Sequence, residues 1–291
     1  MNYEHLARIK AFISLYSTKE TTNILDGDFR SVFRGRSLDF DDLREYTYGD
    51  NVKDIDWKSS TKTGKTLVRR YVAEKKHNVL FVVDSGDKME ADTSGGDDKA
   101  QVALDALGVM AYLVNQGGDD YALLQDSNKG VIFTTFGGGG KHFENMIATS
   151  EMFMPEEGKR DIADLLEYAC ENIRRRMVII VITDMDGLFR LGDKLLGKLV
   201  ANNDVLVVDI DDAYLYGDRV YDIKDRKYES ELLFGGKSLK EAEKAQREDF
   251  LTQMEEKFKS NRVTMVSMGK AEDILPKTIE LFERHKNGII R

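Results

Sequence analysis

Short apolar runs alternate with amphipathic stretches along most of the chain, and this alternation constrains the fold more than any other feature. The runs that we expect to form strands are Val79–Val83, Tyr121–Leu124, Val131–Phe136, Met177–Thr183, Val205–Ile210 and Val263–Ser267. Amphipathic helices are expected from Asp97 or Asp98 to about Asn115 and at Asp161–Ile173, Asp193–Ala201, Ser238–Lys259 and Ala271–Lys286. This order predicts an α/β fold: a doubly wound, mostly parallel sheet with helices on both faces.

The first 75 residues have a different character. Ile9 and its apolar neighbours lie on one face of an expected N-terminal helix, a polar stretch rich in Gly and Asp follows, and Thr66–Val72 has the composition of a strand. We therefore divide the chain into an N-terminal helix plus β-rich segment, residues 1–75, and an α/β domain, residues 76–291. An irregular stretch near 211–235 is expected to form a hairpin insertion at the sheet edge.

Charge and composition limit the classes of partner. The chain of 291 residues is 33% charged with a formal net charge of −9, so neither nucleic acid nor an anionic membrane surface is an expected partner. Its single cysteine, Cys170, excludes an intramolecular disulfide and fits a reducing compartment. The apolar runs are much shorter than the roughly 20 residues of a membrane span. We expect a soluble, cytoplasmic protein.

A segment of about forty residues before the first buried strand concentrates charged and aromatic side chains in a fixed order. It reads Leu-Arg-Glu-Tyr from position 43, Gly-Asp from 49, Ile-Asp-Trp-Lys from 55 and Arg-Arg-Tyr from 69. This order resembles the signature of the MoxR-associated, von Willebrand factor A-like family (domain of unknown function 58). The signature residues are Arg44, Glu45, Tyr46, Gly49, Asp50, Asp56, Trp57, Lys58 and Arg69.

The resemblance implies a sheet of von Willebrand factor A type and a non-enzymatic, chaperone-like adaptor. Such an adaptor works with a MoxR-type AAA+ ATPase in the assembly or maturation of another protein, and ATP hydrolysis belongs to the partner. The signature residues would either form the protein-binding patch or fix the N-terminal segment onto the sheet. In the second, structural interpretation we expect Trp57 to be buried, and Asp50 and Asp56 to cap turns or to bind Arg44 or Arg69.

Two of the expected central strands end in aspartate. Asp84 follows Val79–Val83 and Asp184 follows Met177–Thr183, and ligands of open α/β sheets bind at the carboxyl ends of the strands. In the family that the chain resembles, an Asp-x-Ser-x-Ser motif, a middle-loop Thr and a later Asp hold Mg²⁺. Here Gly86 and Lys88 replace the two serines, and the loop that we assign as the middle one, Gly137–Lys141, has no clear Thr.

This departure leaves an incomplete set of ligands, so no metal or other cofactor is expected; Mg²⁺, if bound at all, would be held by Asp84 and Asp184. Two carboxylates at one edge repel each other unless a cation compensates them. We hypothesise that the Lys88 ammonium replaces the ion and pairs with Asp84 or Asp184. The alternative is that Lys88 points to solvent, because exposed ion pairs are weak.

Two other motifs point to different chemistry. Residues 59–66 are one glycine short of a phosphate-binding loop, but the strand before it and the helix after it are not expected. Asp184 and Asp186 match the Asp-x-Asp-Gly motif of haloacid-dehalogenase-type phosphatases, which are Mg²⁺-dependent. Such a phosphatase is the alternative to an adaptor, and a metal-dependent ligand-binding module without turnover is a third class.

Overall fold

The computed structural model describes most of the α/β domain and part of the segment before it. The described residues are 7, 9, 11, 42–48, 52, 55–70, 76–154, 158, 160–215, 219–222, 227–230 and 237–289. The signature positions Gly49 and Asp50 lie outside these residues. Within them, no helix is both long enough and apolar enough to cross a bilayer.

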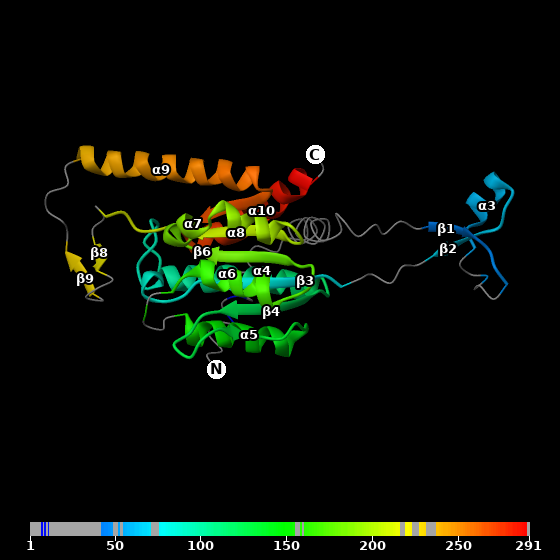
Figure 1. The fold of residues 1–291 in the computed structure, drawn as a ribbon, viewed down its shortest axis with the longest axis horizontal. Helices are drawn as coiled ribbons and strands as arrows, with labels where there is room; N and C mark the ends of the chain where they lie inside the picture. Colours follow the sequence, from blue (N-terminus) through cyan, green and yellow to red (C-terminus); the bar gives the residue numbers. More distant parts are fainter. Residues whose placement is uncertain are drawn as a thin grey trace.

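The signature segment forms a small unit of its own. Strands β1 (Asp42–Glu45) and β2 (Leu67–Arg70) pair antiparallel, and helix α3 (Trp57–Thr63) lies between them in the chain. Asp56 caps α3 by accepting a hydrogen bond from Ser59 N–H at 3.0 Å, and Gly64 ends it with φ of +69°, a conformation that favours glycine. In Figure 1 this unit lies apart from the α/β layers.

The main sheet confirms the predicted fold class. Its strand order is β10-β7-β6-β3-β4-β5, and every neighbouring pair is parallel except β4 and β5. The strands are β3 (Asn78–Val83), β4 (Asp120–Gln125), β5 (Ile132–Phe133), β6 (Val178–Thr183), β7 (Asp204–Ile210) and β10 (Val263–Met268). The central strands are almost wholly buried, as expected of parallel strands that are covered on both faces.

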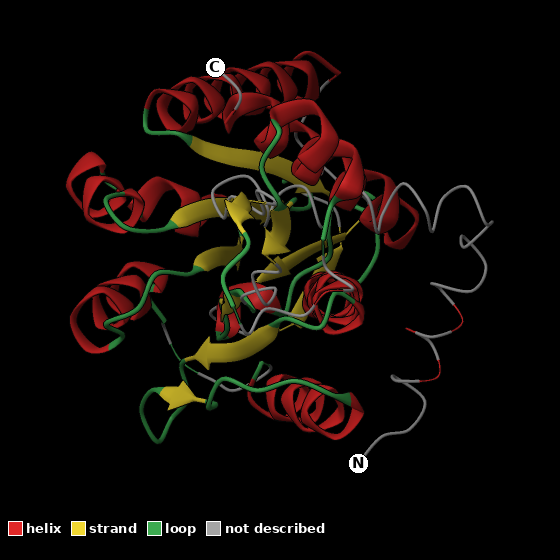
Figure 2. Ribbon diagram, turned by 90° about the vertical axis from the view of Figure 1, so that its right-hand side faces the viewer, coloured by secondary structure: helices red, strands yellow, loops and turns green. Residues whose placement is uncertain are grey.

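Helices cover both faces of this sheet (Figure 2). Helices α4 (Lys99–Gln116), α5 (Gly140–Phe153) and α10 (Ile274–Ile289) pack on one face, and α6 (Ile162–Asn172), α7 (Met185–Arg190), α8 (Asp193–Val200) and α9 (Lys237–Ser260) on the other. Successive strand residues alternate between the two cores: Phe81 packs with α4, and Val82 packs with α6. Ile9, from the N-terminal helix, is buried in the core beside α4.

The irregular stretch near 211–235 contains a hairpin, which forms a two-stranded sheet of its own and does not join the main sheet. Strands β8 (Arg219–Asp222) and β9 (Lys227–Ser230) form an antiparallel pair between β7 and α9. Figure 1 shows this hairpin beyond the carboxyl ends of the central strands. The hairpin connects the stretch after β7 to the first half of α9. Both of these lie at the carboxyl edge of the sheet.

Two predicted elements differ in extent. The strand expected at Val131–Phe136 is only Ile132–Phe133, and it pairs antiparallel with the end of β4, which leaves β5 at the edge of the sheet. The last helix begins with a short 3-10 turn, η3 (Ala271–Asp273), before α10. Pro276 then lies in the first turn of α10, where a missing N–H breaks no helical hydrogen bond.

Candidate functional site

The two strand-ending aspartates meet at the carboxyl edge of the sheet, as the sequence predicted. Strands β3 and β6 are direct parallel neighbours, with Val83 opposite Ile182, and Asp84 N–H donates to Ile182 O at 2.9 Å. Both aspartates are buried. Two buried carboxylates at the ends of neighbouring strands repel each other, so cations or hydrogen-bond donors have to compensate their charge.

The Asp84 carboxylate is enclosed by donors. Thr183 Oγ1 donates to its Oδ2 at 2.5 Å, and Ser85 N–H donates to its Oδ1 at 2.9 Å. Burial raises the pKa of Asp84 to about 6, although the charge of Lys88 acts in the opposite direction. Asp84 is therefore ionised at neutral pH but is protonated in mild acid.

Asp184 shares its two oxygens between a helix and a lysine. Its Oδ1 accepts from Gly187 N–H at 2.9 Å and so caps α7, and its Oδ2 accepts from Lys99 Nζ at 2.8 Å. Burial alone would raise the pKa of Asp184, but the ammonium groups of Lys99 and Lys88 outweigh it and hold the pKa below its ordinary value. The carboxylate is therefore charged and fully engaged.

Lys88 points inward and pairs with both aspartates. It lies on the 3-10 turn η2 (Asp87–Met89), and its Nζ is 2.7 Å from Asp84 Oδ2 and 3.4 Å from Asp184 Oδ1. A third carboxylate, Asp186 Oδ2, is 3.6 Å away. Burial lowers the pKa of Lys88, but the charges of Asp84 and Asp184 raise it above its ordinary value. This geometry agrees with the hypothesis that the Lys88 ammonium takes the place of an ion.

A second buried lysine, Lys99, was missed by the sequence reasoning. It is the first residue of α4, its Nζ pairs with Asp184 and Asp212, and it also donates to Lys88 O at 3.0 Å. With 1% of its surface exposed, it is among the largest fully buried side chains. The signal was available, because Lys99 lies four residues before Ala103 and so continues the buried face of α4.

The residues present do not fit a Mg²⁺ ion of the kind that the fold family implies. The cation position is occupied by the Lys88 ammonium, and Gly86 has φ of +96° with no room for a side chain. A Cβ at Gly86 would overlap Gly158 O and lie 2.8 Å from Arg160 Cγ, so a serine hydroxyl is excluded there. In the described part of the chain, no cluster of three or more His, Cys, Asp or Glu is arranged to hold a metal.

The glycine loop that follows β5 lies at the wrong edge for a ligand loop, which corrects the sequence expectation. Because β5 runs antiparallel to β4, the chain returns to the amino edge, where Gly137 bridges to Tyr121. The segment that approaches Gly86 is instead the one around Gly158. Gly158 N–H donates to Asp87 Oδ1 at 2.8 Å, and Asp87 N–H donates to Gly158 O at 3.3 Å.

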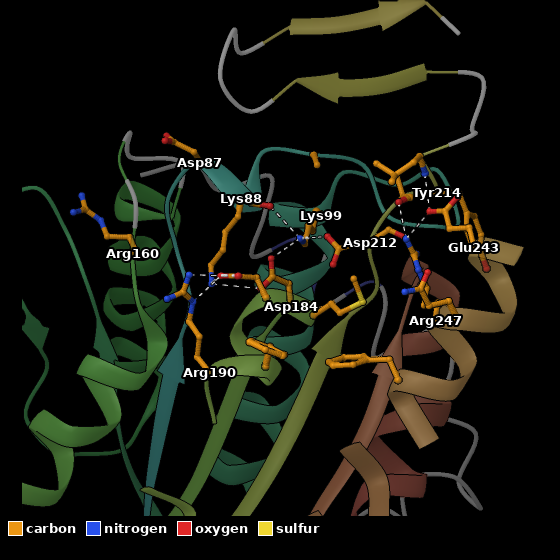
Figure 3. Close-up of a pocket in the computed structure, with 18 of the residues that line it drawn as sticks. Asp87, Lys88, Lys99, Arg160, Asp184, Arg190, Asp212, Tyr214, Glu243 and Arg247 are labelled. Atoms are coloured by element: carbon orange, nitrogen blue, oxygen red, sulfur yellow. Dashed lines mark hydrogen bonds and ion pairs between the residues drawn. The ribbon is translucent and has the colours of Figure 1, made fainter. Parts of the chain in front are cut away.

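A pocket of about 810 Å³ opens over these charged groups (Figure 3). Lys88, Lys99, Asp184 and Asp212 lie at its charged end. Its apolar lining comes from α7, from the stretch after β7 and from α9: Met185, Phe189, Tyr214, Leu215 and Phe250. The pocket therefore combines a paired set of charges with apolar walls.

Arg247 stabilises one wall of the pocket. Its guanidinium lies 4.5 Å from the centre of the Tyr214 ring, donates to Ala213 O at 3.0 Å, and pairs with Asp211 and Glu243 at 3.4 Å each. Glu243 Oε1 in turn accepts from Leu215 N–H at 2.9 Å. These contacts attach the stretch after β7 to α9.

A further buried carboxyl, Asp209 on β7, was also missed. It is 1% exposed, within a strand that the sequence presents as largely apolar. Burial raises its pKa to about 8, against a hydrogen bond from Ser267 that acts in the opposite direction, so Asp209 is mostly protonated at neutral pH. A charged residue type inside an apolar strand is the sequence signal that could have identified it.

The signature residues do not join this site. Arg44 and Glu45 lie on β1, Arg69 on β2, and Tyr46 directly after β1. Asp56 caps α3 as one interpretation expected, whereas the expectation that Trp57 is buried is wrong: Trp57 is 66% exposed. The reason is local, because α3 begins at Trp57 and none of its residues is buried; Lys58 beside it is exposed as well.

The structure also shows where the phosphate-binding-loop-like motif and the Asp-x-Asp-Gly motif lie. Residues 57–63 form α3 and a strand follows, so the context of a phosphate-binding loop is missing. Asp186 is half-exposed and pairs with Arg190 Nε at 2.9 Å. Asp184 and Asp186 thus lie at the start of one short helix, each already engaged by a cation.

Uncharacterized proteins of Mycobacterium tuberculosis and Mycobacterium bovis are 23% identical over 207 residues, which is 70% of this chain and 65% of theirs. The chain thus spans about two thirds of the length of these relatives.

Solved structures that match part of this chain include the conserved hypothetical protein BatB from Bacteroides thetaiotaomicron, at 10% identity and a TM-score of 0.47 over 72% of this chain and 99% of that one. A von Willebrand factor type A protein from Catenulispora acidiphila, at 9% identity, has a TM-score of 0.43 over 77% and 44%.

The family model described as "Protein of unknown function DUF58" matches residues 42–259, from β1 to the end of α9. This match covers the signature unit, the strands that carry Asp84 and Asp184, and the hairpin insertion. The chain therefore belongs to the DUF58 family.

Proposed function

We propose that the chain is a non-enzymatic adaptor that works with a MoxR-type AAA+ ATPase in the assembly or maturation of another protein. In this proposal the partner hydrolyses ATP, and the chain supplies a rigid α/β body and an exposed contact unit. The observation that carries the proposal is the exposure of Trp57, the only tryptophan, within the family signature.

Three large apolar side chains of the signature segment are each exposed to water. Tyr48 is fully exposed, and Trp57 and Val52 are exposed by 66% and 59%. Tryptophan and tyrosine are enriched among the residues that contribute most to protein–protein binding. An aromatic group that is exposed at the surface without a packing role is typical of a docking surface.

The chemistry of the carboxylate edge favours a binding role over catalysis. Asp184, the nucleophile of the phosphatase alternative, has one oxygen bound to Gly187 N–H and the other to Lys99. A nucleophilic oxygen has to be free to approach a phosphorus atom. The lysines also occupy the position where a phosphatase would need a divalent ion.

Affinity purification of the tagged full chain from its native cell extract, with and without ATP, tests the proposal. We expect a AAA+ ATPase to be enriched in a nucleotide-dependent way, and Trp57→Ala to abolish the enrichment. Met152→Ala is the matched control, since Met152 is a comparably exposed apolar residue on α5, outside the signature unit.

Reproducible absence of the ATPase from the purified material, while it is detectable in the extract, would contradict the adaptor proposal. Equal loss of enrichment in Trp57→Ala and Met152→Ala would contradict the role of the signature unit. In either case the next assay is Mg²⁺-dependent hydrolysis of an aryl phosphate, compared between the wild type and Asp184→Asn.

A further inference from the structure

The side-chain amide of Gln125, the last residue of β4, is buried without a hydrogen-bond partner among the residues that the structure describes. Gln125 is 0% exposed, and both its Oε1 and its Nε2 are unpaired there. Buried polar groups of folded proteins are as a rule paired with protein groups or with ordered water, because an unpaired group is destabilising. This amide, which can both donate and accept, therefore requires a polar partner at the end of β4.

The hydroxyl of Ser150 on α5 is a second group of this kind. Ser150 is 0% exposed, and its Oγ has no hydrogen-bond partner in the described part of the chain. The neighbouring Thr149 satisfies its hydroxyl within the helix, by donating to Asn145 O at 2.7 Å. Ser150 makes no such bond, so its hydroxyl is available to a group outside its own helix.

The two side chains face the same core, between the sheet and α5. Leu123 belongs to the core that contains α4 and α5, and Gln125, two residues further along β4, faces the same side. Val83, opposite Gln125 on β3, is in this core as well. On α5, Ile147 packs in this core, and Ser150 continues the same buried face three residues later.

The two residues also lie at the same level of the sheet. Helix α5 runs beside β4 (Figure 1) and ends next to the carboxyl edge, where Gly86 N–H donates to Met154 O at 3.3 Å. Ser150 is one helical turn, about 5.4 Å, before that end, since Met154 N–H donates to Ser150 O at 2.9 Å. Ser150 is therefore level with the ends of β3 and β4, where Gln125 lies.

The amide and the hydroxyl do not bond to each other, so their polar atoms are farther apart than one hydrogen bond reaches. A water molecule donates two hydrogen bonds and accepts two, and buried waters typically have about three polar partners. Gln125 Oε1, Gln125 Nε2 and Ser150 Oγ supply three such atoms. All three are neutral, so nothing in this set selects an ion, and an apolar group would leave them unpaired.

We propose that the layer between the end of β4 and α5 holds an internal water molecule that is hydrogen-bonded to the side chains of Gln125 and Ser150. The site adjoins the carboxyl edge of the sheet, because Asp126, the residue after Gln125, accepts a hydrogen bond on its carbonyl from Ser85 Oγ at 3.1 Å. Ser85 in turn follows Asp84. The water thus stabilises the end of β4 that contacts the Asp84 loop, and this role is independent of the adaptor proposal.

NMR of the full chain, labelled with ¹⁵N-glutamine, detects such a water directly. We expect a rotating-frame Overhauser cross-peak between water and the side-chain NH₂ of Gln125, with the sign that separates it from chemical exchange. Gln125→Met removes the signal and so assigns it, and Ser150→Ala should weaken it. Gln116, exposed on α4, is the reference for contact with surface water.

Urea unfolding gives a second test, in which the sign of the effect decides. Without a water, Gln125→Met replaces an unpaired buried amide by an apolar side chain of similar length and should raise the unfolding midpoint. With the water, Gln125→Met and Ser150→Ala should each lower the midpoint. The double variant should lose less than the sum, because both residues share one partner. Gln116→Met is the control, and it should leave the midpoint unchanged.

Three results would overturn the inference. They are a higher unfolding midpoint in Gln125→Met, strictly additive losses in the double variant, and the absence of a water cross-peak at an assigned Gln125 amide. A crystal structure in which the Gln125 amide bonds directly to Ser150 Oγ would overturn it as well, whereas a water between the two groups would confirm it.

Discussion

Lys99 supplies positive charge next to two of the carboxylates at the strand ends, Asp184 and Asp212. Its ammonium is buried, and it serves Asp184 and Asp212 at once. Burial of ions is costly, so such a group is stable only while all its partners are present. Removing the lysine leaves the buried Asp184 carboxylate and the partly exposed Asp212 carboxylate without their nearest cation.

We expect Lys99→Met to lower the free energy of unfolding by about 3–5 kcal/mol, the range for breaking a buried ion pair. The matched control is Lys244→Met, which removes an exposed i,i+4 pair with Glu248 and should cost no more than about 1 kcal/mol. Urea unfolding of both variants measures the difference. Similar losses in the two would contradict the structural role of Lys99.

The buried carboxyl group of Asp209 makes the free energy of unfolding depend on pH, and its burial decides the sign of this dependence. Its pKa of about 8 in the folded protein is above that of an unfolded chain, so the native state binds the extra proton. The stabilisation is complete below the unfolded pKa and is lost as the pH rises through about 8. Asp84, with a pKa of about 6, acts in the same direction at lower pH.

Between pH 6 and 8 the free energy of unfolding should therefore fall with pH because of Asp209, by at most about 1.4 kcal/mol per pH unit for one proton. Asp209→Asn should flatten this slope, and Asp193→Asn, at an exposed position, should not. Urea unfolding across this range measures the slopes; an unchanged slope in Asp209→Asn would contradict the assignment.

The sequence predicted part of this network. Asp84 and Asp184 could be brought together because both end buried strands, and the carboxyl ends of neighbouring parallel strands share an edge. Lys88 could be proposed as their cation because it lies in the same loop as Asp84. Lys99 is on a helix, so its contact with Asp184 depends on how α4 packs on the sheet, which periodicity alone does not fix.

At the scale of elements, the contact between β6 and α7 leaves no room for a side chain at one glycine. A Cβ at Gly187 would overlap Thr183 Oγ1 and lie 3.0 Å from Asp84 Oδ2, and the Gly187 N–H binds Asp184. The helix can therefore begin directly after the strand only with glycine at this position.

Gly187→Ala should lower the free energy of unfolding by roughly 1–3 kcal/mol, the usual cost of overpacking. Gly197→Ala is the control, because Gly197 lies within α8 with open space around it; there we expect a gain of roughly 0.4–1 kcal/mol. Thermal or urea unfolding compares the pair. A loss in Gly197→Ala as large as in Gly187→Ala would show that the tight contact is not the cause.

The elements themselves were predictable where the pattern was strong. The central strands β3, β6 and β7 are continuous apolar runs, and their bounds in the structure lie close to those expected. The direction of β5 was not predictable, because a short edge strand can pair either way. Because β5 runs antiparallel to β4, the loop at 137–141 lies at the amino edge of the sheet and not at the carboxyl edge, where the sequence analysis placed it.

At the scale of the whole molecule, the chain combines an α/β body with a small signature unit. The body buries two extensive apolar cores, whereas α3 of the unit contributes no buried residue. The sequence predicted both parts and their order, but charged and aromatic residues in one segment are compatible with an interior network or with a surface. Only the structure distinguishes these, through the exposure of Trp57.

Fluorescence reports directly on this exposure, because Trp57 is the only tryptophan. We expect emission of the full chain to be red-shifted and readily quenched by iodide, as for an indole in water. Binding of the partner should shift the emission to shorter wavelength and protect it from iodide. Blue-shifted, protected emission from the chain alone would contradict the exposed position of Trp57.

The central claim is that lysines, rather than a metal, neutralise the carboxylates at the strand ends. The most direct measurement is the urea unfolding midpoint of the full chain in excess Mg²⁺ and in EDTA at constant ionic strength, with Asp84→Ala measured in parallel. We predict the same midpoint in both solutions, because the Lys88 ammonium occupies the cation position. A saturable increase of the midpoint with Mg²⁺ that Asp84→Ala abolishes would contradict the claim.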